Sequence, residues 1–438
     1  MNGGPRVRAA LRAGRDAAGG PRRAIDLEAF RLQNAGVIYA FSLIVLVFVV
    51  LTELRGRSDY LSLINIANVL DQASLNGILA VSMTVVLITG NFDLSIGSVA
   101  ALSGALALSM LDGHGVAWAV AVGLGSGLAL GLTNGILVQI VGINAFIVTL
   151  GTLTAVRGLV LLLTNGNSID ATSTALSPLS GPGPALNPQL LAVVAGLLTV
   201  GGGVWAARGR LRAERAPISA AHVLMIAGGA ALAVAGKFLF ATSWTLTTPV
   251  YLLASFTAAA WAVLRFTVAG RRLYATGGNA EAARLSGIAV NGYKIAAFAL
   301  SGLAAASVGI IYAGKFNAIN PNALTGTELT VLAAAILGGT SLFGGSGSVV
   351  KSVIGALILY TLSNGFNILN LGANYQGLIE GVVIVVAAGL YTVAGRRGAR
   401  QAGAPGLPTA ATGAQLPGST EPQPADLGST PVPSRTVS

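Results

Sequence analysis

Residues 71–111 read DQASLNGILAVSMTVVLITGNFDLSIGSVAALSGALALSML, and this stretch decides the class of fold. It is an almost continuous apolar run, interrupted only by GNFD at residues 90–93. About 20 apolar residues are enough for one helix to cross a bilayer, so the run predicts two helices. They are either two full spans or two half-helices that meet inside the membrane, where the freed backbone groups must face protein or water.

Similar apolar runs follow one another along the chain. The sequence has 438 residues, of which 53% are hydrophobic and 9% charged, and no soluble domain needs so many runs of spanning length. We therefore predict an all-α polytopic membrane protein with about twelve spans. The predicted spans are residues 35–53, 72–89, 94–111, 117–140, 145–164, 188–207, 221–239, 248–268, 293–313, 328–343, 348–366 and 375–393.

Three regions differ in composition. Residues 1–34 are rich in arginine and lack the apolar core of a signal peptide, so a basic tail is expected there. Residues 35–395 form the predicted membrane domain, which includes a polar loop at residues 270–292. Residues 396–438 are rich in proline, glycine, alanine and threonine, and this composition predicts a disordered tail.

The basic residues indicate the orientation in the membrane. The net charge is +11, but most basic residues lie in short loops between apolar runs, which is typical of a topology signal rather than a nucleic-acid surface. Residues 208–220 and 270–292 carry several arginines, whereas residues 165–187 carry no basic residue. The positive-inside rule then places both arginine-rich loops and both chain ends in the cytoplasm. No nucleic-acid partner is expected.

The sequence lacks the residues of several common sites. Cysteine is absent and the two histidines are far apart, which argues against disulfides and against a metal site. The nearest approach to a phosphate-binding loop, GGSGSVVKS at residues 344–352, has valine where its last glycine is required. We therefore expect neither an enzyme nor a bound cofactor, and ATP-driven work would need a separate ATPase chain.

A weak internal echo predicts two related halves. LTNGILVQIVGIN at residues 132–144 matches LSNGFNILNLGAN at residues 362–374 at the Leu, Asn-Gly, Gly and Asn positions. A Gly-Ser-Val precedes each of them, at residues 97–99 and 347–349. Transporters are often built from such repeats, and a chance match between glycine- and leucine-rich helices is the alternative.

Residues 277–288, GGNAEAARLSGI, predict a short helix outside the membrane. Asn279 is a favourable N-cap, residues 281–285 are good helix formers, and Gly287 suits a helix stop. The paired alanines would let another backbone approach closely, as at a docking contact. An ordinary ordered loop is the alternative.

This segment resembles the Glu-Ala-Ala loop of ABC-importer permeases, whose short helix docks on an ATPase subunit. Longer motifs are similar to the ribose and xylose branch of sugar-importer permeases, and the likeness covers residues 35–393. These motifs are GNFDLSIGSVAALSG (90–104), FIVTLGTLTAVRGLVLLLTNG (146–166), GRRLYATGGNAEAARLSGI (270–288) and AAILGGTSLFGGSGSV (334–349). An additional apolar pair at about residues 188–239, around a basic loop, resembles the xylose-type permeases rather than the shorter ribose type.

The resemblance implies a type II-like ABC importer permease that works as a homodimer in a bacterial inner membrane. The residues that it assigns to the ATPase contact are Glu281, Ala282, Ala283, Arg284 and Gly287. The ATPase subunit would lie on the cytoplasmic side and hydrolyse the ATP. An extracytoplasmic binding protein would deliver a monosaccharide, D-xylose or a similar sugar.

Polar side chains inside the apolar runs are candidates for the substrate pathway. An aspartate near the centre of a membrane helix costs roughly 2.5–3.5 kcal/mol, so Asp93 needs a partner or water. It either caps the helix that begins at Leu94 or, with Ser95, lines the path. Arg157 also lies within a predicted span and either pairs or reaches the interface. The remaining candidates, which either bind sugar hydroxyls or join helices, are Asn91, Asn134, Asn144 and Asn364.

The sequence also allows other functions. An ion-coupled carrier would need ionisable residues at the membrane midplane, where only Asp93 and Arg157 qualify, and it would leave the helix at residues 277–288 unexplained. A membrane anchor or scaffold would have no use for the many Gly and Asn breaks. Among ABC permeases, one for an amino acid or a nucleoside is the alternative.

Overall fold

The computed structural model describes residues 32–56, 60–186 and 244–370, together with a few isolated positions. Residues 396–438 of the predicted C-terminal tail lie outside the described residues, and so does the predicted N-terminal tail up to residue 31. So do three predicted spans, apart from those isolated positions: residues 188–207, 221–239 and 375–393.

Helices make up most of the described chain. Seven of them are long and apolar enough to cross a membrane: α2 (Leu32–Leu54), α3 (Leu63–Ile88), α4 (Ile96–Ile136), α5 (Ala145–Thr164), α8 (Thr248–Phe266), α11 (Val290–Phe316) and α13 (Val349–Ile368). Three shorter helices lie between them: α9 (Val268–Gly278), α10 (Ala280–Leu285) and α12 (Thr327–Leu337). The predicted helical, polytopic class is confirmed.

Two small sheets depart from the all-helical prediction. Strand β1 (Ile169–Asp170) pairs antiparallel with β4 (Ala318–Ile319), and β2 (Pro182–Leu186) pairs antiparallel with β3 (Trp244–Thr247). A 3-10 turn, η3 (Ser177–Leu179), lies between β1 and β2. These strands are two to five residues long. Each pairs with a segment far away in the sequence, so no local pattern predicts them.

The predicted spans 94–111 and 117–140 correspond to two arms of helix α4, whose second arm continues into a π turn. Gly115 breaks the helix with φ 79° and ψ 175°, a conformation that glycine adopts readily. The Oγ atoms of Ser103 and Ser126 are 2.9 Å apart, so the arms on either side of Gly115 pack against each other. A π turn, η2 (Leu137–Val141), ends the second arm.

The run at residues 71–111 forms two full-length helices rather than two half-helices. Helix α3 has 26 residues and is about 39 Å long, more than the ~30 Å of a hydrocarbon core. The first arm of α4 follows after a short turn. The polar side chains of that turn are buried, since Asn91 is only 7% and Asp93 1% exposed.

The predicted span at residues 328–343 is wrong in its length. Helix α12 has only 11 residues and is about 16 Å long, half of a hydrocarbon core. Hydropathy overestimated the span because Leu342 and Phe343 continue the apolar run, although the helix ends at Leu337.

Arg157 provides hydrogen-bond donors for the backbone of the irregular segment that precedes α12. Its guanidinium donates hydrogen bonds of 2.8 Å to the carbonyl oxygens of Pro321 and of Ala323. Non-helical backbone at membrane depth is tolerated where protein groups satisfy it. The partner that we expected for Arg157 is therefore backbone, supplied by a segment that follows it by more than 160 residues.

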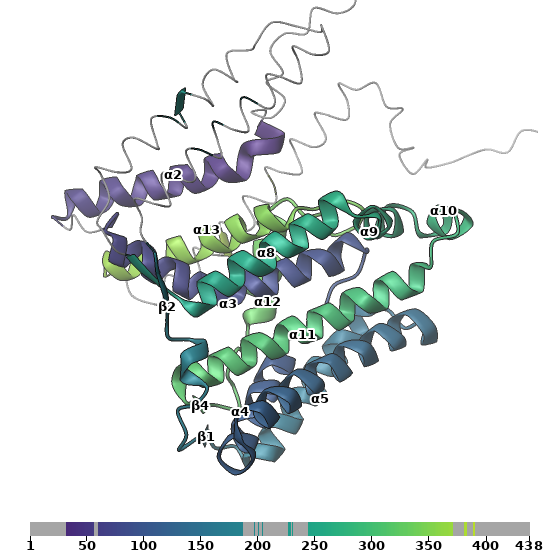
Figure 1. The fold of residues 1–438 in the computed structure, drawn as a ribbon. Helices are drawn as coiled ribbons and strands as arrows, with labels where there is room; N and C mark the ends of the chain where they lie inside the picture. The colour runs from purple at the N-terminus through teal and green to yellow at the C-terminus, as the bar shows by residue number, and fades with distance from the viewer. Residues whose placement is uncertain are drawn as a thin grey trace, which may run out of the picture. The chain divides into compact units, whose positions relative to one another are not determined.

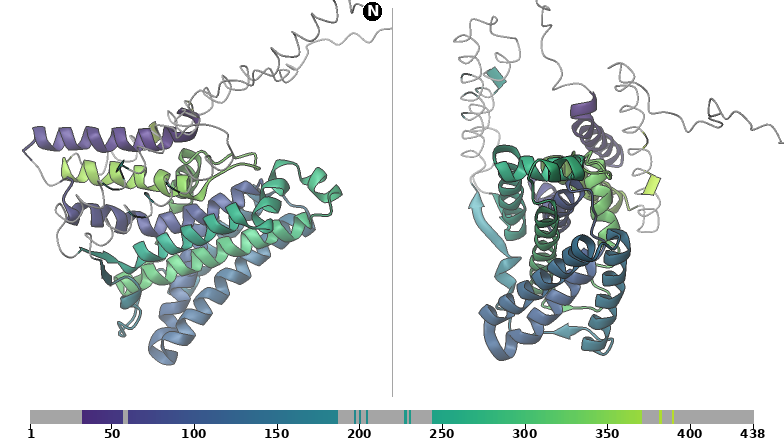
Figure 2. Two further views of the ribbon diagram at one scale, coloured as in Figure 1. Left: turned by 45° about the horizontal axis from the view of Figure 1, so that its top comes forward. Right: turned by 90° about the vertical axis from the view of Figure 1, so that its right-hand side faces the viewer.

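Helix α11 lies between two groups of helices (Figures 1 and 2). On one side it packs against both arms of α4, and α4 contacts α5; on the other it packs against α3, which contacts α8, α12 and α13. The contact with α4 depends on glycine. A Cβ atom on Gly127 would lie 2.4 Å from the carbonyl oxygen of Gly302, and one on Gly309 would lie 1.9 Å from that of Ala100. Small residues let membrane helices approach this closely.

The two sequence echoes occupy different places in the fold. Residues 97–99 and 132–136 lie on separate arms of α4, whereas residues 347–349 and 362–368 lie at the start and the end of the single helix α13. The two motifs of each pair are therefore separated by two helical arms in one place and by a single helix in the other. Two related halves stay a prediction.

Candidate functional site

Helix α11 runs from one end of the helical body to the other. Its N-terminus follows α10 and its C-terminus leads into β4, and 27 helical residues span about 40 Å. We call these the α10 end and the β4 end. Candidate functional residues lie at both ends and between them.

The predicted short helix in the 270–292 loop is confirmed as α10. The side chain of Asn279 accepts a hydrogen bond of 2.9 Å from the Ala282 amide, as an N-cap does. Gly287 has φ 78° and ends the segment. Helix α9 before it was not predicted, because its glycines at 270, 277 and 278 disguise a helix that Thr267 caps.

The coupling candidates on α10 differ in exposure. Glu281, Ala282 and Arg284 are exposed, and Glu281 and Arg284 form an ion pair of 3.1 Å. An exposed pair of this kind contributes little to stability, so both side chains are free to contact a partner. Ala283 is only 4% exposed. It packs inside its own chain and holds α10 in place, and Ala282 is the alanine that faces outward.

The start of this loop is fastened to two other elements. A Cβ atom on Gly277 would lie 1.7 Å from the Ile88 carbonyl oxygen at the end of α3, so backbones touch there. That same oxygen accepts a hydrogen bond of 2.9 Å from the Gly345 amide. The Tyr274 hydroxyl donates to the Gly347 carbonyl at 2.9 Å, and burial raises the pKa of Tyr274 above its ordinary value, so this phenol stays a protonated donor. Displacement of the loop would therefore be passed to α3 and α13.

Asp93 is the centre of a buried polar network. Its Oδ1 accepts hydrogen bonds from the Ser95 amide at 2.9 Å and the Ser95 hydroxyl at 2.5 Å, and its Oδ2 accepts one from the Ser301 hydroxyl at 2.8 Å. Asn134 donates to Ser95 Oγ at 2.9 Å and accepts from Thr152 at 2.7 Å. The network joins the start of α4, its second arm, α5 and α11.

Both carboxylate oxygens of Asp93 thus have partners inside the chain. The structure shows the contact with the start of α4 that we expected for a cap, although that helix begins at Ile96 rather than at Leu94. The polar network also brings together three of the pathway candidates, namely Asp93, Ser95 and Asn134. The sequence contained no signal for Ser301, which is one of many serines on apolar helices.

The other asparagine candidates are placed apart from this network. Asn144 is exposed and caps α5, where it accepts a hydrogen bond of 2.9 Å from the Phe146 amide. Asn364 exchanges two hydrogen bonds of 2.9 and 3.1 Å with Asn65, which joins α13 to α3. Asn91 is buried and donates to the hydroxyl and the carbonyl oxygen of Thr89, at 3.3 and 3.4 Å. Helix capping and helix joining account for Asn144 and Asn364.

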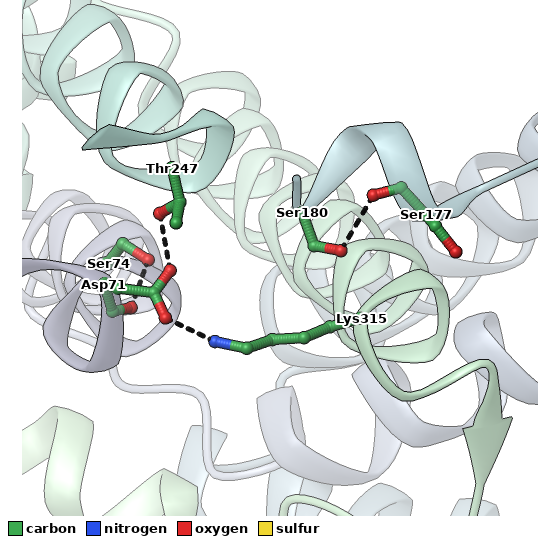
Figure 3. A network of polar contacts seen from close by, with 6 residues as sticks. All are labelled: Asp71, Ser74, Ser177, Ser180, Thr247 and Lys315. Atoms are coloured by element: carbon green, nitrogen blue, oxygen red, sulfur yellow. Dashed lines mark hydrogen bonds and ion pairs between the residues drawn. The ribbon is translucent and has the colours of Figure 1, made fainter. Parts of the chain in front are cut away.

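The β4 end carries an ion pair that the sequence did not indicate (Figure 3). Lys315 Nζ, at the end of α11, lies 2.6 Å from Asp71 Oδ2 on α3. Thr247 on β3 donates a hydrogen bond of 2.5 Å to the other oxygen of Asp71, and Ser74 donates to its carbonyl oxygen. The contact therefore holds three elements together. Its partners are 244 residues apart.

In the part of the chain that the structure describes, no group of three or more histidine or acidic residues could hold a metal ion. Two grooves in the same part of the chain are lined almost entirely by apolar side chains. One lies between α3, α8 and α13, and another between α2 and α13.

Comparison with known proteins decides the family. Residues 65–388 match the family described as the permease component of the branched-chain amino acid transport system. The chain belongs to this family. The expected likeness to the ribose and xylose branch of ABC permeases is also confirmed.

Three relatives show how far that likeness extends. The chain is 36% identical to the xylose transport system permease protein of Escherichia coli (strain K12) over 378 residues, covering 85% of this chain and 94% of that protein. It is 35% identical over 347 residues to the ribose import permease protein of the same strain, covering 79% and 91%. The ribose import permease protein of Bacillus subtilis (strain 168) is 32% identical over 357 residues, covering 81% and 92%. No solved structure matches the chain at a significant level.

Proposed function

We propose that this chain is the membrane-spanning permease subunit of an ATP-driven importer for a monosaccharide, with D-xylose as the first candidate. The observation that carries the proposal is near-full-length similarity to xylose and ribose permease proteins. The capped, exposed helix α10 at the end of a body without a phosphate-binding motif is consistent with it. A partner ATPase would hydrolyse ATP, and this chain would break no covalent bond.

In this proposal α10 is the contact for the ATPase subunit. Closure of two ATPase subunits on ATP would displace the helices α10 of two permease copies in a homodimer. The backbone contacts of Gly277 and Gly345 with Ile88 would pass that displacement to α3 and α13. The pathway between the copies would open alternately to either side, and an extracytoplasmic binding protein would supply the sugar at the β4 end.

Two other functions compete with this proposal. The family description names branched-chain amino acids, so an amino acid is the second candidate cargo. An ion-coupled carrier would need ionisable side chains that are available to the ion. Asp93, Arg157 and the Asp71–Lys315 pair are each held by protein groups instead.

Reconstitution in proteoliposomes tests the function. With the ATPase subunit and the binding protein present, we expect uptake of labelled D-xylose that requires ATP and is unaffected by an ionophore. Excess unlabelled ribose should compete partly and leucine not at all. Uptake that needs an ion gradient but no ATPase would contradict the proposal, and competition by leucine alone would replace the sugar with an amino acid.

The orientation belongs to the same proposal: the α10 end, the loop at residues 208–220 and both chain ends lie in the cytoplasm. About twelve crossings follow if α12 and the segment before it count as one broken crossing. Because the chain has no cysteine, single cysteines can report the orientation. In intact cells an impermeant maleimide should label Thr174→Cys readily and should not label Ser286→Cys, both positions being exposed. The reverse pattern would invert the map.

A further inference from the structure

The α10 end carries the two most exposed large apolar side chains in the described part of the chain. The exposed fraction is 92% for Phe343 and 81% for Leu285. Both lie outside the helices that are long enough to span a membrane. Leu285 ends α10 between Arg284 and Ser286, and Phe343 lies in the turn between α12 and α13, which reads TSLFGGSGS over residues 340–348.

The turn that presents Phe343 is firmly built. The Ser341 amide donates a hydrogen bond of 3.0 Å to the Ser346 carbonyl and closes the turn, and the Ser341 hydroxyl accepts one of 3.1 Å from the Phe343 amide. Gly344 and Gly345 both have positive φ. This rigid geometry presents an aromatic ring outward at little entropic cost, as a binding anchor requires.

The turn is continuous with the α10 loop. A Cβ atom on Gly345 would lie 2.7 Å from the Cα of Gly278, and one on Gly344 would lie 2.7 Å from the carbonyl oxygen of Gly277. Helix α10 begins two residues after Gly278. Phe343 and Leu285 therefore project from two segments whose backbones touch.

The surroundings of these side chains are basic. Four exposed arginines lie on α8, α9 and α10: Arg265, Arg271, Arg272 and Arg284. Between residues 262 and 292 the sequence contains one acidic residue, Glu281. Apolar anchors within a charged rim are typical of a protein–protein contact.

We propose that the turn at residues 341–346 is a second docking element for the ATPase subunit beside α10, with Phe343 on the turn and Leu285 on α10 as the two apolar anchors of one surface. The partner surface would contain an apolar pocket for an aromatic ring, with acidic groups around it that meet the arginines. The inference rests on the proposed function and adds to it a contact outside the Glu-Ala-Ala loop. Docking on the turn would also bring the ATPase into direct contact with the segment that joins α12 to α13.

Truncation of the anchors tests this contact. The full-length chain in lipid nanodiscs is titrated with the ATPase subunit that restores uptake with it. Phe343→Ala and Leu285→Ala should each weaken binding about 30-fold, as at an aromatic or aliphatic hot spot. The matched control is Leu162→Ala, since Leu162 is 77% exposed but lies on the spanning helix α5; its affinity should stay within twofold of wild type. Phe343→Ala with wild-type affinity would overturn the inference.

A photo-crosslinking probe identifies what covers residue 343. With p-benzoylphenylalanine at this position, we expect a crosslink to the ATPase subunit, whereas the same probe at residue 162 should give none. A crosslink at residue 343 to lipid alone, or to a second copy of the permease, would overturn the inference. Failure of the proposed function gives a different result, because wild-type permease would then bind no ATPase subunit at all.

Discussion

Replacing Asp93 with alanine is expected to destabilise the permease by about 3 kcal/mol or more and to abolish sugar uptake. The change leaves three buried donors without an acceptor: the Ser95 amide, the Ser95 hydroxyl and the Ser301 hydroxyl. Each unsatisfied buried donor costs about 1–3 kcal/mol, and Ser95 and Ser301 are completely buried. Chemical unfolding in detergent and uptake in proteoliposomes measure the two effects.

Asp93→Asn separates the structural role from a role in the path. The amide keeps one acceptor for Ser95, and the Ser301 hydroxyl can turn round and accept from the new amide group. If Asp93 only joins helices, this variant should keep most of the stability and most of the uptake. A variant that is as stable as wild type but inactive would show instead that the carboxyl group itself serves transport.

The outer part of the same network provides a graded comparison. Thr152→Val removes one hydrogen bond to Asn134, and Thr152 is only partly buried. Its expected cost is about 1 kcal/mol, the net value of one ordinary hydrogen bond. A cost equal to that of Asp93→Ala would mean that the network acts as one cooperative unit and that Asp93 is not its centre.

Ala282→Trp is expected to abolish ATP-dependent uptake and co-purification of the ATPase subunit, while the permease itself stays folded. Ala282 is exposed on α10, so an indole finds room in the isolated chain but blocks a close docking contact. Ala283→Trp should behave differently, because Ala283 is 4% exposed. An indole there must displace α10 from its own chain, and the variant should lose thermal stability as well as activity.

The same substitution at the other end serves as the control. Ala175 is exposed in the loop between β1 and η3, so Ala175→Trp adds the same bulk about one membrane thickness away. It should retain the ATPase subunit fully, whatever it does to the binding protein. If Ala282→Trp also retains its ATPase and transports at the wild-type rate, α10 is not the coupling element.

The sequence by itself determined the membrane class, seven helices at predicted spans, and the cap and stop of α10. These features are local or compositional: spanning length follows from the apolar run, and Asn279 and Gly287 act on neighbouring backbone groups. The resemblance carried by four motifs was also contained in the sequence. The errors of the prediction also had local causes. Glycines concealed α9, and an apolar turn made the predicted span at residues 328–343 longer than α12 is.

Only the tertiary structure decided which polar groups meet. Asp71 pairs with Lys315, Asp93 with Ser301, and Arg157 with the backbone before α12, all across more than 150 residues. It also decided that Ala283 faces its own chain whereas Ala282 faces outward. For the membrane-spanning helices, the physical reason is that such a helix is apolar on every side, because lipid and protein neighbours both favour apolar groups. Hydrophobic periodicity then does not reveal which face is buried, and the meeting of helix faces settles it.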